Sequence, residues 1–266
     1  MTVNFNDSLA WSRYPWTLVR WTRVSGVPLD DDDSEELARL LSVHAVEHRL
    51  NGAPQLLEAW FRVHAGGASY TNLEQEAIRA FLGPLGPTAP VDHRQSSVAE
   101  YLWHVLSTVD DSEPQLVRIH GPKFYATAPG GDGLTIRRDG DLVVTLWEIK
   151  KHTGSHLTNT IRDAYAQLSS GAPRYLAEQA AVSQITPDPE EARVMARLVE
   201  SWLAGESHMQ AGVAVVTDRS LHRCFSTMRR YFTHLQSGDP CQGLSASIED
   251  YPQFAERVCE IAWTGL

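Results

Sequence analysis

Apolar residues recur at helical spacing in the first third of the chain. They predict a helix that ends at Asn51-Gly52, a second helix that Pro54 opens, and a third after the capping-box pair Thr71 and Glu74. The run 16–24, rich in Val, Thr and Trp, instead predicts a strand. We therefore expect this part of the chain to be mainly helical.

The segment 83–92 holds three prolines and two glycines, and we take it as the boundary between an N-terminal region, residues 1–90, and a second region, residues 91–266. The second region mixes both element types: a helix over 94–109, strands over 115–120, 133–138 and 142–149, a helix over 157–170 that ends near Gly171, two further helices, a strand over 211–217, and helices over 219–235 and 249–263. Asp139-Gly140 joins the second and third strands as a hairpin. The order helix, three strands, helix, strand predicts an α/β fold of mixed α+β type.

The composition is that of a globular protein, with 266 residues, 42% apolar residues and a formal charge of -10. No apolar run approaches the roughly 20 residues of a membrane-spanning helix, and the first residues lack the pattern of a signal peptide, so we expect a cytoplasmic protein with no membrane contact. Three cysteines without a C-x-x-C pair indicate neither a disulfide framework nor a zinc knuckle. The negative charge argues against a protein that coats nucleic acid through bulk electrostatics, but a local DNA site is compatible with it.

Lysine is rare in this chain, where only three of the 23 basic residues are lysines: Lys123, Lys150 and Lys151. Lysine carries a compact amine, whereas arginine carries a planar guanidinium group. A position that keeps lysine in this arginine-rich chain is therefore a candidate for chemistry. Glu148 and Lys150 lie two residues apart in a strand, so their side chains leave the same face. The hairpin returns the chain past Gly133 and brings Asp132 beside Glu148. Two carboxylates and an amine then converge on one sheet edge.

The carboxylates of Asp132 and Glu148 are oxygen ligands of the kind that Mg²⁺ or Mn²⁺ prefers. Two such ligands leave positions open for water and a phosphate oxygen, which suits metal-assisted phosphodiester hydrolysis. The backbone carbonyl of Ile149 is a candidate third ligand. Lys150 is placed to orient or deprotonate the attacking water, or to balance charge on the phosphorus. The alternative is an exposed strand with an ordinary cross-strand ion pair.

With Asp132 in a turn and Glu148 and Lys150 in the third strand, the chain resembles the PD-(D/E)xK nuclease superfamily in motif and in the order of its core elements. The resemblance covers about residues 94–217. It implies a restriction-endonuclease-like core, metal ligation by Asp132 and Glu148, and a catalytic Lys150. Glu100 corresponds to the acidic residue that such nucleases often carry on the first core helix, where it adds to the catalytic and metal-binding set; a solvated charge is the alternative.

A narrower resemblance is to the nuclease subunit of Hachiman-type antiphage defence systems, which works with a helicase partner. The parallels are Glu100, the segment Lys123-Phe124-Tyr125, Asp132 and residues 146–150. This resemblance implies a metal-dependent endonuclease that acts on DNA under the control of a helicase-type protein. The N-terminal region is the expected docking surface, and its tryptophans are either interface anchors or parts of its own core: Trp11, Trp16, Trp21 and Trp60.

Three further residues near the motif are candidates for DNA contact or support: Lys151, Arg162 and Gln167. Arg162, like His152 and His156, belongs to the segment after the catalytic strand, where phosphate contacts are expected. Gln167 lies on the following helix, where related nucleases often place a glutamine that supports the metal or the lysine. An ordinary solvated surface position is the alternative for each.

Two other functions compete with the nuclease. Residues 44–48 match the H-x-x-E-H pattern of inverted zinc peptidases, in which His44 and His48 bind Zn²⁺ and Glu47 acts as the base. Both histidines lie on the apolar stripe of their helix, so buried core or interface histidines explain them more simply. The other alternative is a catalytically silent adaptor with a nuclease fold. The intact set of Asp132, Glu148 and Lys150 argues against this alternative.

Overall fold

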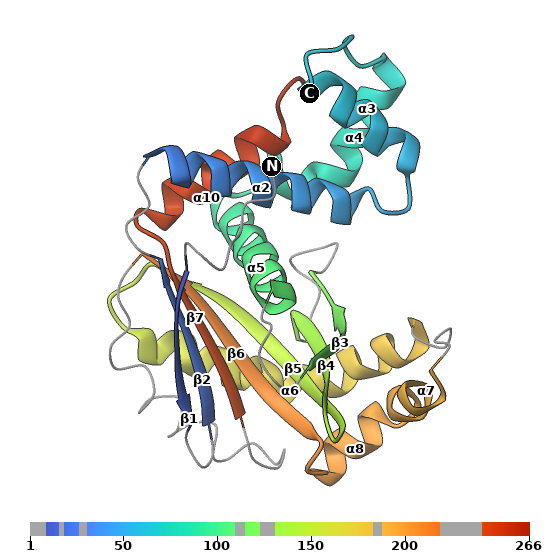
Figure 1. The fold of residues 1–266 in the computed structure, drawn as a ribbon, viewed down its shortest axis with the longest axis vertical. Coiled ribbons are helices and arrows are strands. Elements are labelled where there is room, and N and C mark those ends of the chain that lie inside the picture. The colour runs from blue at the N-terminus through green and yellow to red at the C-terminus, as the bar shows by residue number, and fades with distance from the viewer. Residues whose placement is uncertain are drawn as a thin grey trace.

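The structure, a computed structural model, describes residues 9–15, 19–26, 31–109, 115–122, 131–182, 188–218 and 241–266. Within these residues, seven strands form one mixed sheet in the order β1-β2-β7-β6-β5-β4-β3 (Figure 1). The strands are β1 (Leu9–Pro15), β2 (Val19–Gly26), β3 (Gln115–His120), β4 (Gly133–Asp139), β5 (Asp141–His152), β6 (Met209–Thr217) and β7 (Cys241–Ser247). β3, β4 and β5 pair antiparallel, whereas β5, β6, β7 and β2 run parallel, and β1 returns antiparallel at the edge. β5 therefore joins the antiparallel part of the sheet to the parallel part.

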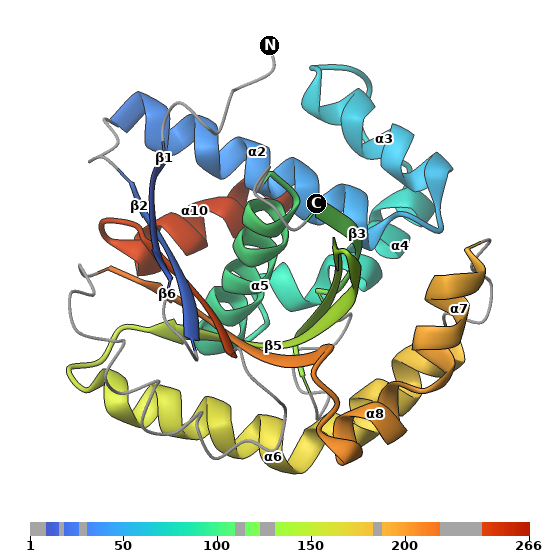
Figure 2. The same ribbon diagram turned by 60° about the horizontal axis from the view of Figure 1, so that its bottom comes forward.

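Helices cover both faces of this sheet (Figure 2). One face carries α5 (Val91–Val109) together with α2 (Asp31–Arg49) and α10 (Tyr251–Ala262), and the small helices α3 (Pro54–His64), α4 (Asn72–Leu82) and η1 (Gly83–Leu85) pack beside them. The opposite face carries α6 (Leu157–Val182), α7 (Pro189–Ala196) and α8 (Leu198–Ala204). No helix in the described residues is long and apolar enough to cross a lipid bilayer.

The mixed α+β class expected from the sequence is confirmed. The strands expected over 115–120, 133–138, 142–149 and 211–217 are β3, β4, β5 and β6, and α5 precedes them as expected. Gly140 of the hairpin has φ of 71°, a left-handed conformation that glycine adopts without a Cβ clash. The helix expected over 219–235 lies outside the described residues.

α6 continues to Val182, so the end expected near Gly171 is wrong. Pro173 lies inside this helix, where it removes one backbone N–H donor. The helix nevertheless continues because Leu168, Ala172 and Leu176 on its inner face are fully buried against the sheet. Burial of an apolar face outweighs a local propensity penalty of this kind.

The N-terminal region is less exclusively helical than the sequence predicts, because β1 and β2 belong to it. Only the run 16–24 was expected to be a strand, and β2 covers most of it. β2 pairs in parallel with β7, so one sheet holds strands from both sides of the segment 83–92. η1 lies within that segment, between α4 and α5.

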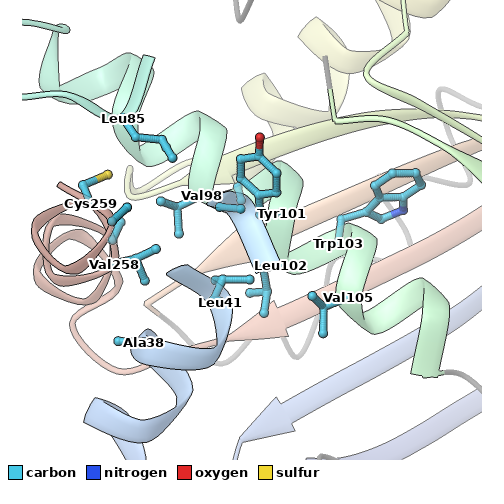
Figure 3. Close-up of a cluster of buried hydrophobic side chains, with 14 of the residues drawn as sticks. Ala38, Leu41, Leu85, Val98, Tyr101, Leu102, Trp103, Val105, Val258 and Cys259 are labelled. Atoms are coloured by element: carbon cyan, nitrogen blue, oxygen red, sulfur yellow. The ribbon is translucent and has the colours of Figure 1, made fainter. Parts of the chain in front are cut away.

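A single cluster of buried apolar side chains joins the helices of the N-terminal region to those of the second region. Figure 3 shows Leu41 of α2, Val98 and Leu102 of α5, and Val258 of α10 gathered in this cluster. The two regions therefore share a core.

Trp60 of α3 is part of the shared core instead of an exposed interface anchor. Its side chain is 2% exposed, and its Nε1 donates a hydrogen bond to the carbonyl oxygen of Ala262 at 3.1 Å. Trp11 and Trp21 lie in β1 and β2, whose side chains are not described, and Trp16 lies outside the described residues. The expected role of Trp60 in partner docking is thus not supported by its position.

Trp147 of β5 lies flat on a glycine of the neighbouring strand. A Cβ added to Gly212 of β6 would lie 2.6 Å from the indole of Trp147, so only glycine leaves room for this ring. Trp147 Nε1 donates to Thr135 Oγ1 of β4 at 2.9 Å. The indole thus spans three adjacent strands and fixes their register next to residue 148.

This packing predicts that Gly212→Ala destabilises the protein. The added methyl group must displace the buried indole of Trp147, and overpacking of this kind costs about 1–3 kcal/mol of unfolding free energy. Urea unfolding followed by tryptophan fluorescence measures the change. Gly52→Ala is the matched control, since a Cβ at Gly52 meets no atom within 4 Å; equal stability of the two variants would contradict the prediction.

Candidate active site

β5 presents different side chains to the two helical layers. Ile149 and Trp147 belong to the apolar cluster on the α5 side, as the alternation of a strand requires. Lys150 points to the opposite layer, where its Nζ donates to Oε1 of Gln167 on α6 at 2.5 Å. Glu148 shares the face of Lys150, and the two side chains are in contact, with 2.7 Å between Lys150 Nζ and Glu148 Oε1.

Asp132 is held at the start of β4, next to the strand residues that follow Trp147. The backbone N–H of Asp132 donates to the carbonyl oxygen of Trp147 at 2.8 Å. Asp132 Oδ2 in turn accepts a hydrogen bond from the N–H of Ile149 at 2.8 Å. Since Gly133 pairs with Trp147 in the ladder, these bonds place Asp132 beside Glu148 where the pairing ends.

A polar cleft of about 880 Å³ opens at the carboxyl end of β5, between the N-terminal parts of α5 and of α6. Its lining brings together Glu100, Asp132, Ile149, Lys150 and Gln167 with three further residues that the sequence places near the motif, Lys151, His152 and His156. The other lining residues are Asp92, Ser96, Thr153, Gly154, Ser155, Asn159, Thr160, Ser170 and Gly171. Residues separated by up to 79 positions in the sequence thus meet at one surface depression.

Glu148 shares a strand face with Lys150, as the sequence predicts, but it lies deeper than the lysine. Its side chain is 1% exposed, and it does not reach the lining of the cleft. Lys150, with 21% of its side chain exposed, does line the cleft. The glutamate therefore lies beneath the lysine.

Lys151 projects from the other face of β5 and contacts α5. Its Nζ lies 2.6 Å from Asp92 Oδ1 and donates to Gln95 Oε1 at 2.7 Å. The backbone carbonyl of Gln95 also accepts a hydrogen bond from the hydroxyl of Tyr251 on α10 at 2.6 Å. Lys151 thus anchors the first turns of α5 to the strand that carries the motif, a supporting contact within the protein.

The other support candidates have different positions. Arg162 does not line the cleft, and more than half of its side chain is exposed, 3.9 Å from the carboxylate of Asp163. His152 is buried and hydrogen-bonded through Nδ1 to Thr160 Oγ1 at 2.8 Å. The segment Lys123-Phe124-Tyr125 lies outside the described residues.

Sequence reasoning missed the contribution of Asp92 and Ser96 to the cleft. Together with Glu100 they lie at intervals of four residues, which places them on one face of α5. That spacing is visible in the sequence, but it gains meaning only once Glu100 is known to face a cleft. The α5 wall is therefore polar over three turns.

The carboxylates of Asp132 and Glu100 both act on Tyr175, which comes from α6. Burial raises the pKa of the Tyr175 phenol, and the negative charges of Asp132 and Glu100 raise it further. Tyr175 thus stays protonated near two acidic groups, one directly before β4 and one on α5. The raised pKa of Tyr175 therefore reflects the presence of both carboxylates near the same buried phenol.

The donor chemistry fits Mg²⁺ or Mn²⁺ better than Zn²⁺. The candidate ligands Asp132, Glu148 and the carbonyl of Ile149 supply oxygen only, and Mg²⁺ commonly keeps several waters alongside one or two protein carboxylates. A buried carboxylate such as Glu148 also favours a cation beside it. Across the described parts of the chain, no group of three or more His, Cys, Asp or Glu side chains is arranged to hold a metal ion. A cation here would therefore depend on water for most of its coordination.

The histidines of the rival motif face a different environment. His44 Nε2 and Nδ1 of His104 on α5 are hydrogen-bonded at 2.9 Å, and the ring of His48 packs edge-on against His104 and Tyr101. Glu47 is exposed to solvent. The two imidazoles of the H-x-x-E-H pattern thus lie in a helix–helix contact, and the glutamate does not converge with them.

No model of a known protein family matches the chain, and no curated protein matches it.

The cluster of His44, His48 and His104 predicts that stability falls in acid. Burial lowers the pKa of His44 to about 4 and that of His104 to about 3, and burial also lowers the pKa of His48. Since the unfolded imidazoles titrate near about 6.5, the unfolded chain binds more protons than the folded chain between these values. The contribution of the cluster is therefore complete above about pH 6.5 and declines as the pH falls toward 4.

Urea unfolding at a series of pH values from 7 to 4.5 measures this decline. His104→Asn removes one of the three half-buried imidazoles, so its unfolding free energy should depend less steeply on pH than that of the wild type. Parallel pH profiles for the two proteins would show that the cluster does not cause the dependence.

Proposed function

We propose that this protein is a metal-dependent deoxyribonuclease of the PD-(D/E)xK type. One observation carries the proposal: Asp132, Lys150 and Glu100, together with Gln167, line one cleft, and Glu148 lies directly beneath Lys150. Glu148 and Lys150 lie in β5 and Asp132 directly precedes β4, whereas Glu100 comes from α5 and Gln167 from α6. The order α5, β3, β4, β5, α6 and later β6 is also the order that the proposed core requires.

Each group has a role in the hydrolysis of a phosphodiester bond. Asp132, Glu148 and the carbonyl of Ile149 would hold Mg²⁺ or Mn²⁺, which supplies Lewis acidity and an activated water when bound. Lys150 donates hydrogen bonds, so it orients the attacking water or stabilises negative charge on the phosphoryl oxygens. Gln167 orients Lys150 through the 2.5 Å contact. Glu100 adds a further carboxylate on the cleft wall.

The negative charge of the chain supports a low affinity for DNA in the absence of a partner. The formal charge is -10, and the cleft lining carries the acidic residues Asp92, Glu100 and Asp132 against Lys150 and Lys151. Nonspecific DNA affinity comes mainly from cation–phosphate contacts and counterion release, and such contacts are few here. We therefore propose that the protein is the cytoplasmic effector subunit of an antiphage defence complex, in which a helicase-type partner presents DNA and restrains the cleft.

Cleavage of plasmid DNA in the presence of Mg²⁺ tests the proposed activity. The Glu148 carboxylate and the Lys150 amine should both be essential. Glu148→Gln and Lys150→Met should each lower the cleavage rate by about 100-fold or more, the range expected for loss of a positioned acid–base or charge-stabilising group. The buried amide of Glu148→Gln keeps the shape of the carboxylate, so the thermal midpoint reports whether folding is intact.

Arg197→Gln is the matched control, because it also removes one charge but lies between α7 and α8 in contact with Glu206, outside the cleft. It should cleave at the wild-type rate. A well-folded wild-type protein without cleavage, alone and with its partner, would instead identify a catalytically silent adaptor. Full activity in Glu148→Gln would show that the site lies elsewhere.

The proposed partner predicts a second result. The isolated chain should cleave plasmid slowly, and co-purification with the product of the neighbouring gene should change both DNA binding and the cleavage rate. Size-exclusion chromatography followed by the plasmid assay measures the two effects. A chain that binds no neighbour and degrades DNA rapidly by itself would refute the partner.

A further inference from the structure

We propose that Lys150 is an internal counter-cation of Glu148, so that a divalent cation must displace Lys150 before Glu148 can bind it. This inference rests on the proposed function, because it assigns Glu148 as a metal ligand. It adds a regulatory step to that function, because binding of the cation to Glu148 also releases Lys150 into the cleft.

The contacts of Lys150 support this assignment. Its Nζ lies 2.7 Å from Glu148 Oε1 and donates to Gln167 Oε1 at 2.5 Å, so the ammonium is held between a strand residue and a helix residue. Charge-assisted contacts of this length are the strong ones. Lys150 is therefore engaged at the floor of the cleft and does not project toward a substrate.

The burial of Glu148 makes this contact necessary. Its side chain is 1% exposed, whereas that of Lys150 is 21% exposed and lines the cleft. A carboxylate removed from water requires a positive partner, because the desolvation cost of an unpaired buried charge is large. Lys150 supplies that charge and also covers the carboxylate on its cleft side.

A divalent cation and the Lys150 ammonium therefore compete for the same carboxylate. Once displaced, Lys150 keeps its charge and its place in the cleft wall, where the proposed reaction needs it. The competition has a measurable consequence opposite to the usual effect of mutating a site residue: removal of the Lys150 amine should strengthen metal binding while it abolishes cleavage.

Lys151 provides a matched control within the same strand. It carries the same charge one residue further on, but its Nζ contacts Asp92 and Gln95 on the opposite face of β5. Loss of either lysine changes the net charge equally, so general electrostatic attraction affects both variants. Of the two lysines, Lys150 is the one whose amine contacts Glu148.

Titration with MnCl₂, followed by calorimetry and by the electron paramagnetic resonance signal of free Mn²⁺, measures the affinity without reference to cleavage. Lys150→Met should bind Mn²⁺ about tenfold more tightly than the wild type, and Lys151→Met should stay within about threefold of it. Lys150→Gln should behave like Lys150→Met, which guards against a folding defect in one variant. Adding Glu148→Gln to Lys150→Met should abolish the gain.

Equal or weaker Mn²⁺ binding by Lys150→Met, or an equal gain in the Lys151→Met control, would overturn the inference even if the wild type cleaves DNA. Tighter binding by Lys150→Met in a protein that never cleaves DNA would support the counter-cation and refute the nuclease. Absence of Mn²⁺ binding in every variant would overturn both.

Discussion

A carboxylate buried on an interior strand is the constraint on which the rest of the site depends. Glu148 has almost no contact with solvent, so its charge must be balanced from within the protein. Lys150 provides the balance from the same face of β5, and Gln167 holds Lys150 in place from α6. α6 must therefore pack closely along this face at Gln167, where its buried residues Leu168, Ala172 and Leu176 hold it against the sheet.

The aromatic side chains on the other face of β5 complete this arrangement. Trp147 fills the space that Gly212 leaves and bonds to Thr135, so β4, β5 and β6 cannot slide relative to one another. A slip of one residue would reverse the faces of the strand and expose the indole in place of the lysine. The bonds of Asp132 to Trp147 and Ile149 depend on the same register. Apolar packing on one side of the strand thus positions the polar groups on the other.

The sequence was sufficient for the hairpin and its motif because the signals there are local. Asp139-Gly140 defines the turn, and alternation along β5 separates Glu148 and Lys150 from Trp147 and Ile149. The depth of Glu148 and the contacts of Lys151 with Asp92 and Gln95 were not predictable, because both depend on helices that pack from distant parts of the chain. β7 was missed for a related reason: its residues are small and polar, and its partners β2 and β6 determine its conformation.

The pairing of β2 with β7 also affects how the protein folds. Val19 pairs with Cys241, so these two strands cannot meet until the residues up to β7 have been synthesised. At roughly 5–20 residues per second, β1 and β2 wait for at least about ten seconds on the ribosome before β7 emerges. Contacts of such long sequence separation also slow folding, since the entropy of closing a large loop is lost before the pairing is gained. The hairpin of β1 and β2 therefore joins the rest of the sheet only through β7, which pairs with β2 on one side and with β6 on the other.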